Sequence, residues 1–265
     1  MNVGNGPSTD PAPLLKAEGL SKAFGGVQAL YDVSFAVDAG SVQAVIGPNG
    51  AGKTTLFNCM TGLYTVSAGV IRLDGVPIHN RKPHQIVGRG FARTFQNIRL
   101  FANMTALENV MVGRHARTRT GVLGAVLHSR RCLAEERDSR QRAKSLMAFV
   151  GLKDRSRSLA GHLSYGDQRR LEIARALATE PRLLALDEPV AGMNPNERRE
   201  MSELFRKLRD AGITLLLIEH DVKLVMGVCD RVAVLDYGKK IAEGVPDEVR
   251  RNPAVIEAYL GGAVS

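Results

Sequence analysis

The residues from Gly47 to Thr54 (GPNGAGKT) fit the phosphate-binding pattern G-x-x-x-x-G-K-[ST] at every fixed position. Glycines in such a loop let successive backbone N–H groups point inward, and a following helix N-terminus adds about half a positive charge. Lys53 then supplies a charge for the β- and γ-phosphates, and the Thr54 hydroxyl is suited to coordinate Mg²⁺. The stretch predicts a polyphosphate site, against the simpler alternative of a glycine-rich turn.

Two carboxylates, Asp187 and Glu188, directly follow the apolar run 183–186 (LLAL). A continuous apolar run is typical of a parallel strand buried on both faces, and chemistry in such sheets sits at the carboxyl ends of the strands. We expect Asp187 in the Mg²⁺ shell and Glu188 within reach of a water that attacks the γ-phosphate. Acidic residues are also common at helix starts, but the complete phosphate loop upstream favours the catalytic interpretation.

Two further polar residues follow predicted strands, and one further stretch leads into a predicted helix. His220, after the run 213–218 (ITLLLI), is suited to hydrogen-bond a γ-phosphate oxygen, although a His between two acids is often only a surface cluster. Gln96, after the run 91–95, is by itself an ordinary surface residue. The stretch Leu163–Gln168 (LSYGDQ) is either a simple helix N-cap or a second anion-binding helix start, which a second copy of the chain is better placed to use.

Phe24 stands beside Gly25 and Gly26 in a predicted turn between two strands. A lone aromatic there is either a packing residue or a platform for the adenine ring.

These side chains need an alternation of strands and helices to position them. Apolar runs, turn residues and capping signals define the elements. The predicted strands are 14–19, 28–37, 41–46, 70–73 with an Asp-Gly hairpin turn, 91–95, 183–186, 213–218, 231–235 and 240–243; the predicted helices are 53–61, 105–113, 168–178, 246–251 and 253–260. Residues 114–142 are arginine-rich and helical around an apolar patch at 121–127, which suits a membrane surface, a partner helix or a solvated face equally.

Composition narrows the class of protein. The chain has 265 residues and a net charge of +9, which permits an anionic partner without selecting one. Its three cysteines are isolated, so they are expected to be free thiols in a reducing compartment. No window reaches the roughly 18 to 20 apolar residues of a membrane helix, and the first residues lack a signal pattern. Residues 1–13 read as a disordered leader.

Taken together, the motifs and their order resemble the ATP-binding subunits of ABC transporters over the whole chain after residue 13. The resemblance implies that 47–54 is the Walker A loop, 163–167 the signature sequence and Asp187 the Walker B aspartate. It implies Glu188 as catalytic base with His220 and Gln96 beside it, and Phe24 as the adenine platform. The nucleotide-binding residues implied are Phe24, Gly47, Pro48, Asn49, Gly50, Ala51, Gly52, Lys53, Thr54, Thr55, Ser164 and Gly166, and the Mg²⁺ ligands are Thr54, Gln96 and Asp187.

The stretches FARTFQNIRLF, LSYGDQRRLEIARAL, IEHDVKLVMGVCDRV and NPAVIEAYLG look more closely like the branched-chain amino acid importers, with urea-type importers as near neighbours. Three positions depart from the commonest ABC pattern: Tyr165 replaces Gly, Asp167 replaces Gln and Asn194 replaces Asp. These departures put the communication between two ATP sites in question, while Ser164 and Gly166, the family's γ-phosphate contacts, are intact.

The resemblance implies an α/β, RecA-like P-loop cassette over 14–250, with a small antiparallel β subdomain, a helical subdomain at about 97–167 and a family-specific tail at 251–265. It implies ATP and Mg²⁺ as cofactors and a peripheral location on the cytoplasmic face of the inner membrane. The implied partners are membrane-spanning permease subunits, a second ATP-binding subunit in a head-to-tail dimer, and a solute-binding protein.

Two other classes compete with this interpretation. A soluble ABC ATPase that acts on nucleic acid or ribosomes would use the positive charge, but such proteins usually carry two cassettes or a long coiled-coil insertion. We therefore expect no nucleic-acid partner. A P-loop GTPase or kinase would leave the signature stretch and His220 without a role, and no N-K-x-D motif is present.

Overall fold

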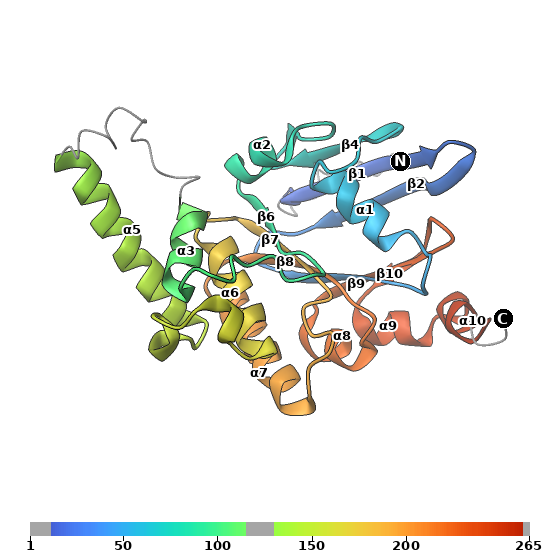
Figure 1. Cartoon of the computed structure of the whole chain (residues 1–265). Helices are drawn as coiled ribbons and strands as arrows, with labels where there is room; N and C mark the ends of the chain where they lie inside the picture. The colour runs from blue at the N-terminus through green and yellow to red at the C-terminus, as the bar shows by residue number, and fades with distance from the viewer. Residues whose placement is uncertain (1–11, 115–129, 262–265) are drawn as a thin grey trace, which may run out of the picture.

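The computed structural model describes residues 12–114 and 130–261, and a parallel sheet forms their centre (Figure 1). Its strands are β3 (Val42–Ile46), β6 (Phe91–Arg93), β7 (Leu183–Asp187), β8 (Thr214–Ile218), β9 (Arg231–Asp236) and β10 (Lys239–Gly244). They lie in the order β10-β9-β3-β8-β7-β6, and only β10 runs antiparallel to its neighbour. The carboxyl ends of the five parallel strands therefore meet at one edge.

A second sheet of four antiparallel strands lies above the first (Figure 1). It consists of β1 (Leu15–Phe24), β2 (Val27–Val37), β4 (Ala68–Leu73) and β5 (Val76–Pro77), in the order β2-β1-β4-β5. The predicted Asp-Gly turn joins β4 to β5, and both Asp74 (φ 51°) and Gly75 (φ 73°) adopt the left-handed conformation that a tight hairpin requires. The predicted small antiparallel sheet is confirmed.

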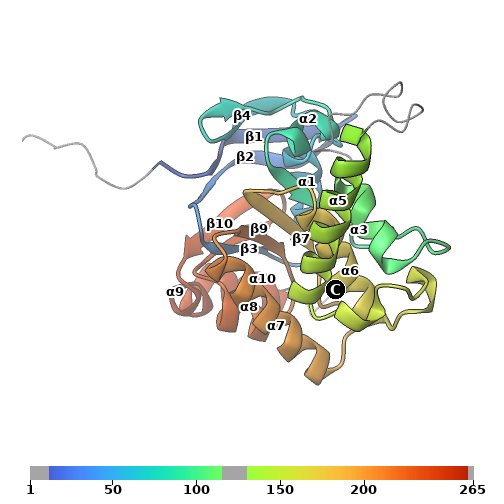
Figure 2. The same ribbon diagram turned by 90° about the vertical axis from the view of Figure 1, so that its left-hand side faces the viewer.

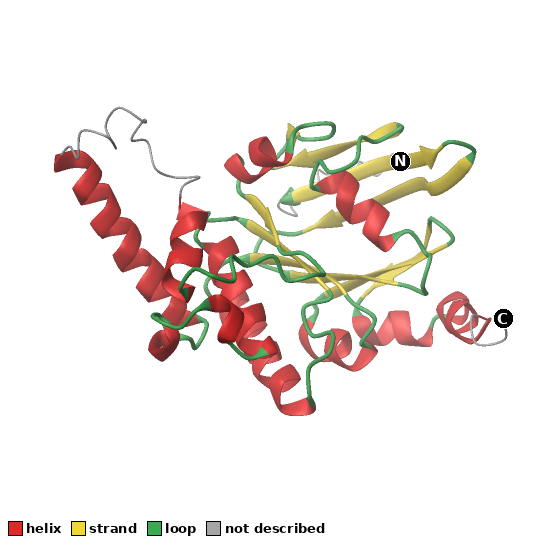
Figure 3. Ribbon diagram, viewed as in Figure 1, coloured by secondary structure: helices red, strands yellow, loops and turns green. Residues whose placement is uncertain are grey.

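Helices surround the parallel sheet on both faces and at one end. They are α1 (Lys53–Met60), α2 (Pro83–Gly88), α3 (Ala106–Arg114), α5 (Arg130–Phe149), α6 (Tyr165–Leu177), α7 (Pro195–Asp210), α8 (Val222–Val228), α9 (Pro246–Arg251) and α10 (Pro253–Gly261). Figure 3 shows α1 between the two sheets, α7 to α9 below the parallel sheet, and α3, α5 and α6 together at one end. The turned view in Figure 2 keeps α3, α5 and α6 grouped.

Each central strand contributes to two separate apolar clusters. On β8, Leu215 and Leu217 pack among the helices below the sheet, whereas Leu216 and Ile218 pack toward α1 and the upper sheet. Strand β7 alternates in the same way. Because both faces are covered, every residue of β3, β7 and β8 is buried, which explains the continuous apolar runs in the sequence.

Some predicted boundaries were wrong. Helix α6 begins at Tyr165 instead of Gln168, because the Ser164 hydroxyl accepts a hydrogen bond from the Asp167 backbone N–H and caps the helix there. Strand β6 ends at Arg93 instead of residue 95, and the first strand continues to Phe24. Helices α2, α7 and α8 were not predicted, although Asn194 and Glu197 form a capping box at the start of α7.

Several predictions concern residues outside the described parts of the chain. Residues 1–11 of the expected leader, the apolar patch at 121–127 and the last residues of the tail, 262–265, are among them. Within the described residues, no helix is long and apolar enough to cross a membrane. Cys59 and Cys229 are buried free thiols, and burial raises the pKa of Cys59 to about 11, so this thiol stays protonated at neutral pH.

Candidate functional site

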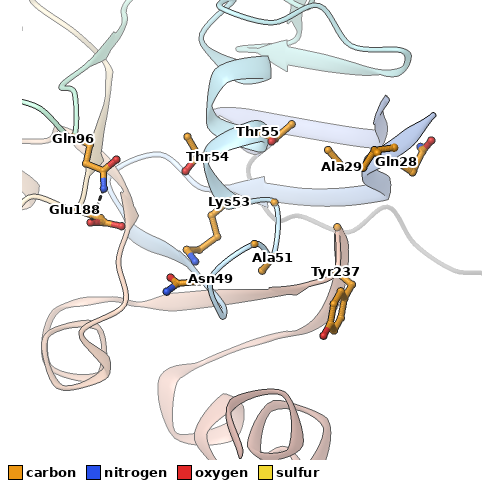
Figure 4. A pocket seen from close by; sticks show the side chains of 14 residues that line it. Gln28, Ala29, Asn49, Ala51, Lys53, Thr54, Thr55, Gln96, Glu188 and Tyr237 are labelled. Atoms are coloured by element: carbon orange, nitrogen blue, oxygen red, sulfur yellow. Dashed lines mark hydrogen bonds between the residues drawn. The ribbon is translucent and has the colours of Figure 1, made fainter. Parts of the chain in front are cut away.

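A cavity of about 680 Å³ opens at the carboxyl edge of the parallel sheet (Figure 4). This volume lies within the usual range for a small-molecule site. The loop after β3, the end of β7, the segment after β6, the start of β2 and the β9–β10 turn all contribute to its wall. The lining residues are Val27, Gln28, Ala29, Asn49, Gly50, Ala51, Gly52, Lys53, Thr54, Thr55, Gln96, Glu188, Tyr237 and Gly238.

The phosphate loop passes so close to other backbone that side chains are excluded at two of its glycines. A Cβ atom on Gly47 would lie 2.1 Å from the Leu235 carbonyl oxygen, and one on Gly52 would lie 2.8 Å from the Ala29 carbonyl oxygen. Gly52 also has φ 97° and is the N-cap of α1. The predicted strand, glycine loop and helix are thus confirmed, and the free N–H groups of the α1 N-terminus border the cavity.

Lys53 is buried in the first turn of α1, and its ammonium group lies within the curve of the loop. The Lys53 Nζ donates hydrogen bonds to the carbonyl oxygens of Gly47 (2.7 Å) and Pro48 (2.8 Å). Burial lowers the pKa of Lys53, and the nearby charges of Glu188 and Asp187 act in the opposite direction. Figure 4 shows this side chain between the loop and the side of the cavity that carries Glu188.

Asp187, at the end of β7, is held by an arginine whose side chain is only 10% exposed and for which the sequence predicted no role. Arg93 Nη2 lies 3.1 Å from Asp187 Oδ2, and Arg93 Nη1 donates to Asn58 Oδ1 (2.7 Å) and Thr61 Oγ1 (2.9 Å) on and next to α1. Its guanidinium group also lies over the Phe57 ring, 4.6 Å from the centroid. Burial raises the pKa of Asp187, and Arg93 counteracts part of that rise.

The three expected catalytic side chains meet on the side of the cavity opposite the phosphate loop. Gln96 Nε2 donates to Glu188 Oε2 at 3.0 Å, and His220 Nδ1 lies 3.8 Å from Glu188 Oε1. Figure 4 shows Gln96 and Glu188 facing each other across from Lys53. Residues 96, 188 and 220 come from three different segments, so only the folded sheet brings them together.

A further carboxylate, Glu219, is fully buried beside this group. Glu219 Oε1 accepts a hydrogen bond from the Val190 N–H at 3.2 Å, and Oε2 accepts from His220 N–H at 3.2 Å. Burial raises the pKa of Glu219, while the backbone donors favour the ionised form. No role was predicted for this residue from the sequence.

The proposed adenine platform lies beside the cavity instead of among its lining residues. Phe24 is 43% exposed and contacts the Tyr64 ring edge-on, with 5.2 Å between centroids. Residues 27–29, just after the Gly25–Gly26 turn, do line the cavity. The stacking role of Phe24 stays a prediction. Tyr237 is 88% exposed at the cavity mouth, and its position after a parallel strand was the signal that would have identified it.

Ser164 and Gly166 do not line this cavity. Ser164 belongs to a separate hollow with Leu163 and Asp167, where its hydroxyl caps α6. Tyr165, one of the departures from the ABC pattern, accepts a hydrogen bond from Arg169 Nη2 at 2.9 Å. Arg169 in turn donates to the backbone carbonyls of Phe95, at 2.7 Å, and Gln96, so the signature helix is tied directly to the Gln96 segment.

Asn194 and Asp167, the other two departures, both serve helix starts. Asn194 Oδ1 accepts hydrogen bonds from the N–H groups of Asn196 (2.9 Å) and Glu197 (3.0 Å). Asp167 lies in the first turn of α6, where a negative charge is favourable. Both substitutions are therefore compatible with the local structure.

Comparison with known proteins agrees with this geometry. The ABC transporter family model matches residues 30–191, and the model of the branched-chain amino acid ATP-binding cassette transporter family matches residues 239–265. Among solved structures, a nucleotide-free ATP-binding cassette of an ABC transporter aligns with a TM-score of 0.82 and 33% identity, covering 93% of this chain and 98% of the other. The ADP conformation of an ATP-binding cassette aligns with the same TM-score and 32% identity, covering 95% of this chain and 100% of the other.

Curated relatives match over almost their full length. The high-affinity branched-chain amino acid transport ATP-binding protein BraF of Pseudomonas aeruginosa is 46% identical over 95% of this chain and 99% of the relative. LivG of Escherichia coli, described in the same words, is 44% identical with the same coverage. The expected P-loop α/β fold is confirmed, and the chain belongs to the ABC transporter family as one of its ATP-binding, ATP-hydrolysing subunits.

Proposed function

We propose that this chain hydrolyses ATP to drive the import of branched-chain amino acids. The relatives named for that transport support the substrate class, as does the C-terminal family match at 239–265. The observation that carries the ATPase mechanism is the placement of Lys53 and Glu188 on opposite sides of one cavity at the edge of the parallel sheet.

In this proposal, ATP phosphates occupy the curve of the phosphate loop. The backbone N–H groups of residues 47–54 and the α1 N-terminus hold the β- and γ-phosphates, and Lys53 exchanges its carbonyl contacts for phosphate oxygens. In this proposal Thr55, which lines the cavity at the start of α1, contacts the α-phosphate. Phe24, which is not among the lining residues, stacks on the adenine ring. The positive loop thus binds the nucleotide largely through main chain.

The oxygen donors at the site fit Mg²⁺. The Thr54 hydroxyl is exposed in the cavity, Gln96 lines it, and one Asp187 oxygen is held by Arg93. Mg²⁺ in nucleotide sites takes few protein ligands and completes its shell with phosphate oxygens and water. The ion would neutralise charge that develops on the phosphates.

Glu188 is the proposed general base. A carboxylate there can accept a proton from the water that attacks the γ-phosphate, with Gln96 and His220 orienting the water and the phosphate. ATP is thereby converted to ADP and phosphate. The backbone carbonyl of Gln96 also accepts a hydrogen bond from Arg169 of α6, the helix that begins within the signature sequence. A change at the nucleotide is thereby linked to that helix.

Completion of the site by a second subunit is supported by the position of Ser164 and Gly166 away from this chain's own cavity. We infer a head-to-tail pair of cassettes, each signature facing the other's phosphate loop, that closes on ATP and opens after hydrolysis. Membrane-spanning permease subunits and a periplasmic or extracellular solute-binding protein complete the proposed importer. In this proposal the cassette, 14–250 with its helical subdomain at about 97–167, lies at the cytoplasmic face of the inner membrane.

Co-purification tests this assembly. The full-length tagged chain is isolated from native membranes, its partners are identified by mass spectrometry, and the complex is reconstituted in vesicles with its solute-binding protein. ATP-dependent uptake of radiolabelled leucine, isoleucine or valine supports the proposal. Uptake of urea without leucine uptake reassigns the substrate to the urea-type importers. Ribosomal proteins or nucleic acid in place of membrane subunits would overturn the transport proposal.

A further inference from the structure

Glu219 is an acidic side chain buried without a cationic partner. Its side chain has no exposed surface, and in the described parts of the chain no lysine or arginine forms an ion pair with it. Backbone N–H groups satisfy it instead: Val190 N–H bonds to Oε1 at 3.2 Å, and His220 N–H (3.2 Å) and Asp221 N–H (3.5 Å) approach Oε2. One carboxylate therefore joins two segments that the sheet order brings together, the turn after β7 and the turn after β8.

The turn after β7 contains an unusual backbone conformation. Glu188 has φ 46°, in the left-handed region that residues with side chains rarely adopt unless the surroundings hold them there. Three contacts hold this turn: Glu188 N–H donates to the Ile218 carbonyl at 2.9 Å, Ala191 N–H donates to the Glu188 carbonyl at 3.2 Å, and Val190 N–H is bound by Glu219. Of these three contacts, the Glu219 contact alone involves a side chain, so it can be changed by mutation.

The second oxygen of Glu219 fixes the turn after β8 in the same way. Its contacts with the N–H groups of residues 220 and 221 set the direction in which the chain leaves β8. The result is the 3.8 Å approach of His220 Nδ1 to Glu188 Oε1. Loss of the Oε1 contact with Val190 frees the turn that carries Glu188, and loss of the Oε2 contacts frees the turn that carries His220.

We propose that Glu219 is a positioning residue for ATP hydrolysis, which holds the backbone of Glu188 and of His220 in one fixed relation. This inference rests on the proposed role of Glu188 as general base. It assigns Glu219 no contact with ATP, because Glu219 is buried behind the turn and is absent from the lining of the cavity.

A purely structural role for Glu219 predicts different behaviour. Buried N–H groups need acceptors wherever they lie, so a structural role would lower thermal stability and nucleotide affinity together. A positioning role lowers kcat while ATP affinity stays unchanged. It also makes the effect depend on Glu188, because a misplaced base matters only when the base is present.

The test uses Glu219→Gln and Glu219→Asp in the full-length chain. Glutamine keeps the shape but turns an N–H₂ group toward backbone N–H donors, and aspartate keeps the charge but is one methylene too short to span both turns. We expect kcat to fall in Glu219→Gln by about 10- to 100-fold, the range for a reacting group displaced by about 1 Å. The dissociation constant for ATP, from equilibrium binding, should stay at the wild-type value in both variants.

Single-turnover hydrolysis of labelled ATP then compares Glu219→Gln in the wild-type and the Glu188→Gln backgrounds. No further loss in the second background supports positioning, whereas the same fold-loss in both backgrounds overturns it. Wild-type kcat in Glu219→Gln also overturns it. Glu203→Gln, an identical change at an exposed position on α7, is the matched control and should behave as wild type. If Glu188→Gln itself keeps full turnover, the assignment of the base fails instead, and the two failures are distinguished.

Discussion

The two sides of the nucleotide cavity are built in different ways. The phosphate loop is a short continuous segment, 47–54, which forms hydrogen bonds within itself, such as those from Lys53 Nζ to the carbonyls of Gly47 and Pro48. On the opposite side, Gln96 and Glu188 line the cavity, Asp187 directly precedes Glu188 in the sequence, and Glu219 and His220 directly follow β8. We call these five residues the hydrolytic side. Its bonds join distant segments: Gln96 and Glu188 are 92 residues apart in the chain.

The difference indicates that ATP binding depends on a local segment of the sequence, whereas hydrolysis depends on contacts between distant segments. A loop held by its own main chain keeps its geometry whenever the strand and helix beside it form. The hydrolytic side keeps its geometry only when β6, β7 and β8 lie in their correct order. Mutations should therefore separate ATP binding from ATP hydrolysis.

Glu188→Gln should retain ATP binding and lose about 10²- to 10⁴-fold in turnover, the contribution of a positioned general base. The change removes a proton acceptor while keeping the side-chain volume. Steady-state phosphate release and equilibrium nucleotide binding measure the two properties. Unchanged turnover would remove Glu188 from the role of base and would contradict the assignment of hydrolysis to this side of the cavity.

Arg93→Met tests the side chain that links both sides, because Arg93 bonds to Asn58 and Thr61 near α1 and to Asp187 on β7. Removing one partner of a buried ion pair leaves the other charge uncompensated, which typically costs about 3–5 kcal/mol. We expect a loss of that order in the free energy of unfolding, measured by urea denaturation.

The matched control is Arg89→Met, at an exposed arginine four residues earlier in the chain, which should change the stability little. Arg93→Lys should recover part of the loss, since it keeps the charge and loses the planar donor geometry. A stability of Arg93→Met equal to that of the control would show that the two sides of the cavity are not linked through Arg93.

Lys53→Ala should weaken ATP binding by about 1.5–3 kcal/mol, equivalent to about 10- to 150-fold in the dissociation constant, because a charged hydrogen bond is lost. Isothermal titration with ATP and Mg²⁺ measures the change. Lys207→Ala, at an exposed lysine on α7, is the control for net charge. An unaltered dissociation constant in Lys53→Ala would argue against the phosphate-loop assignment.

Asn194→Ala should have the smallest effect, a loss of about 1 kcal/mol in the free energy of unfolding, because an N-cap acceptor is removed from α7. Asn194→Asp, which restores the residue common in the family, should keep or slightly increase stability through the helix dipole. Thermal denaturation measures both. A larger loss in Asn194→Asp than in Asn194→Ala would show that the amide of Asn194 does more than cap the helix.

Much of this protein follows from its sequence alone. The phosphate loop, the continuous apolar strands, the Asp-Gly hairpin and the closing helix Pro246–Arg251 were predicted, because each is encoded by neighbouring residues whose spacing matches a backbone geometry. The positions of Asp187, Glu188 and His220 at strand ends were also predictable. Parallel strands place their carboxyl ends at one edge, so residues that follow them share a site.

The tertiary structure decided what holds those residues in place. No local pattern marks Arg93 as the partner of Asp187, or Glu219 as the acceptor for the Val190 N–H, because these contacts join segments that are adjacent only after the strands have ordered. The left-handed backbone conformation of Glu188 could not be predicted from the sequence either, since neighbouring segments maintain it against the residue's own preference. Local sequence determined which groups bind and react, and long-range packing determined their relative positions.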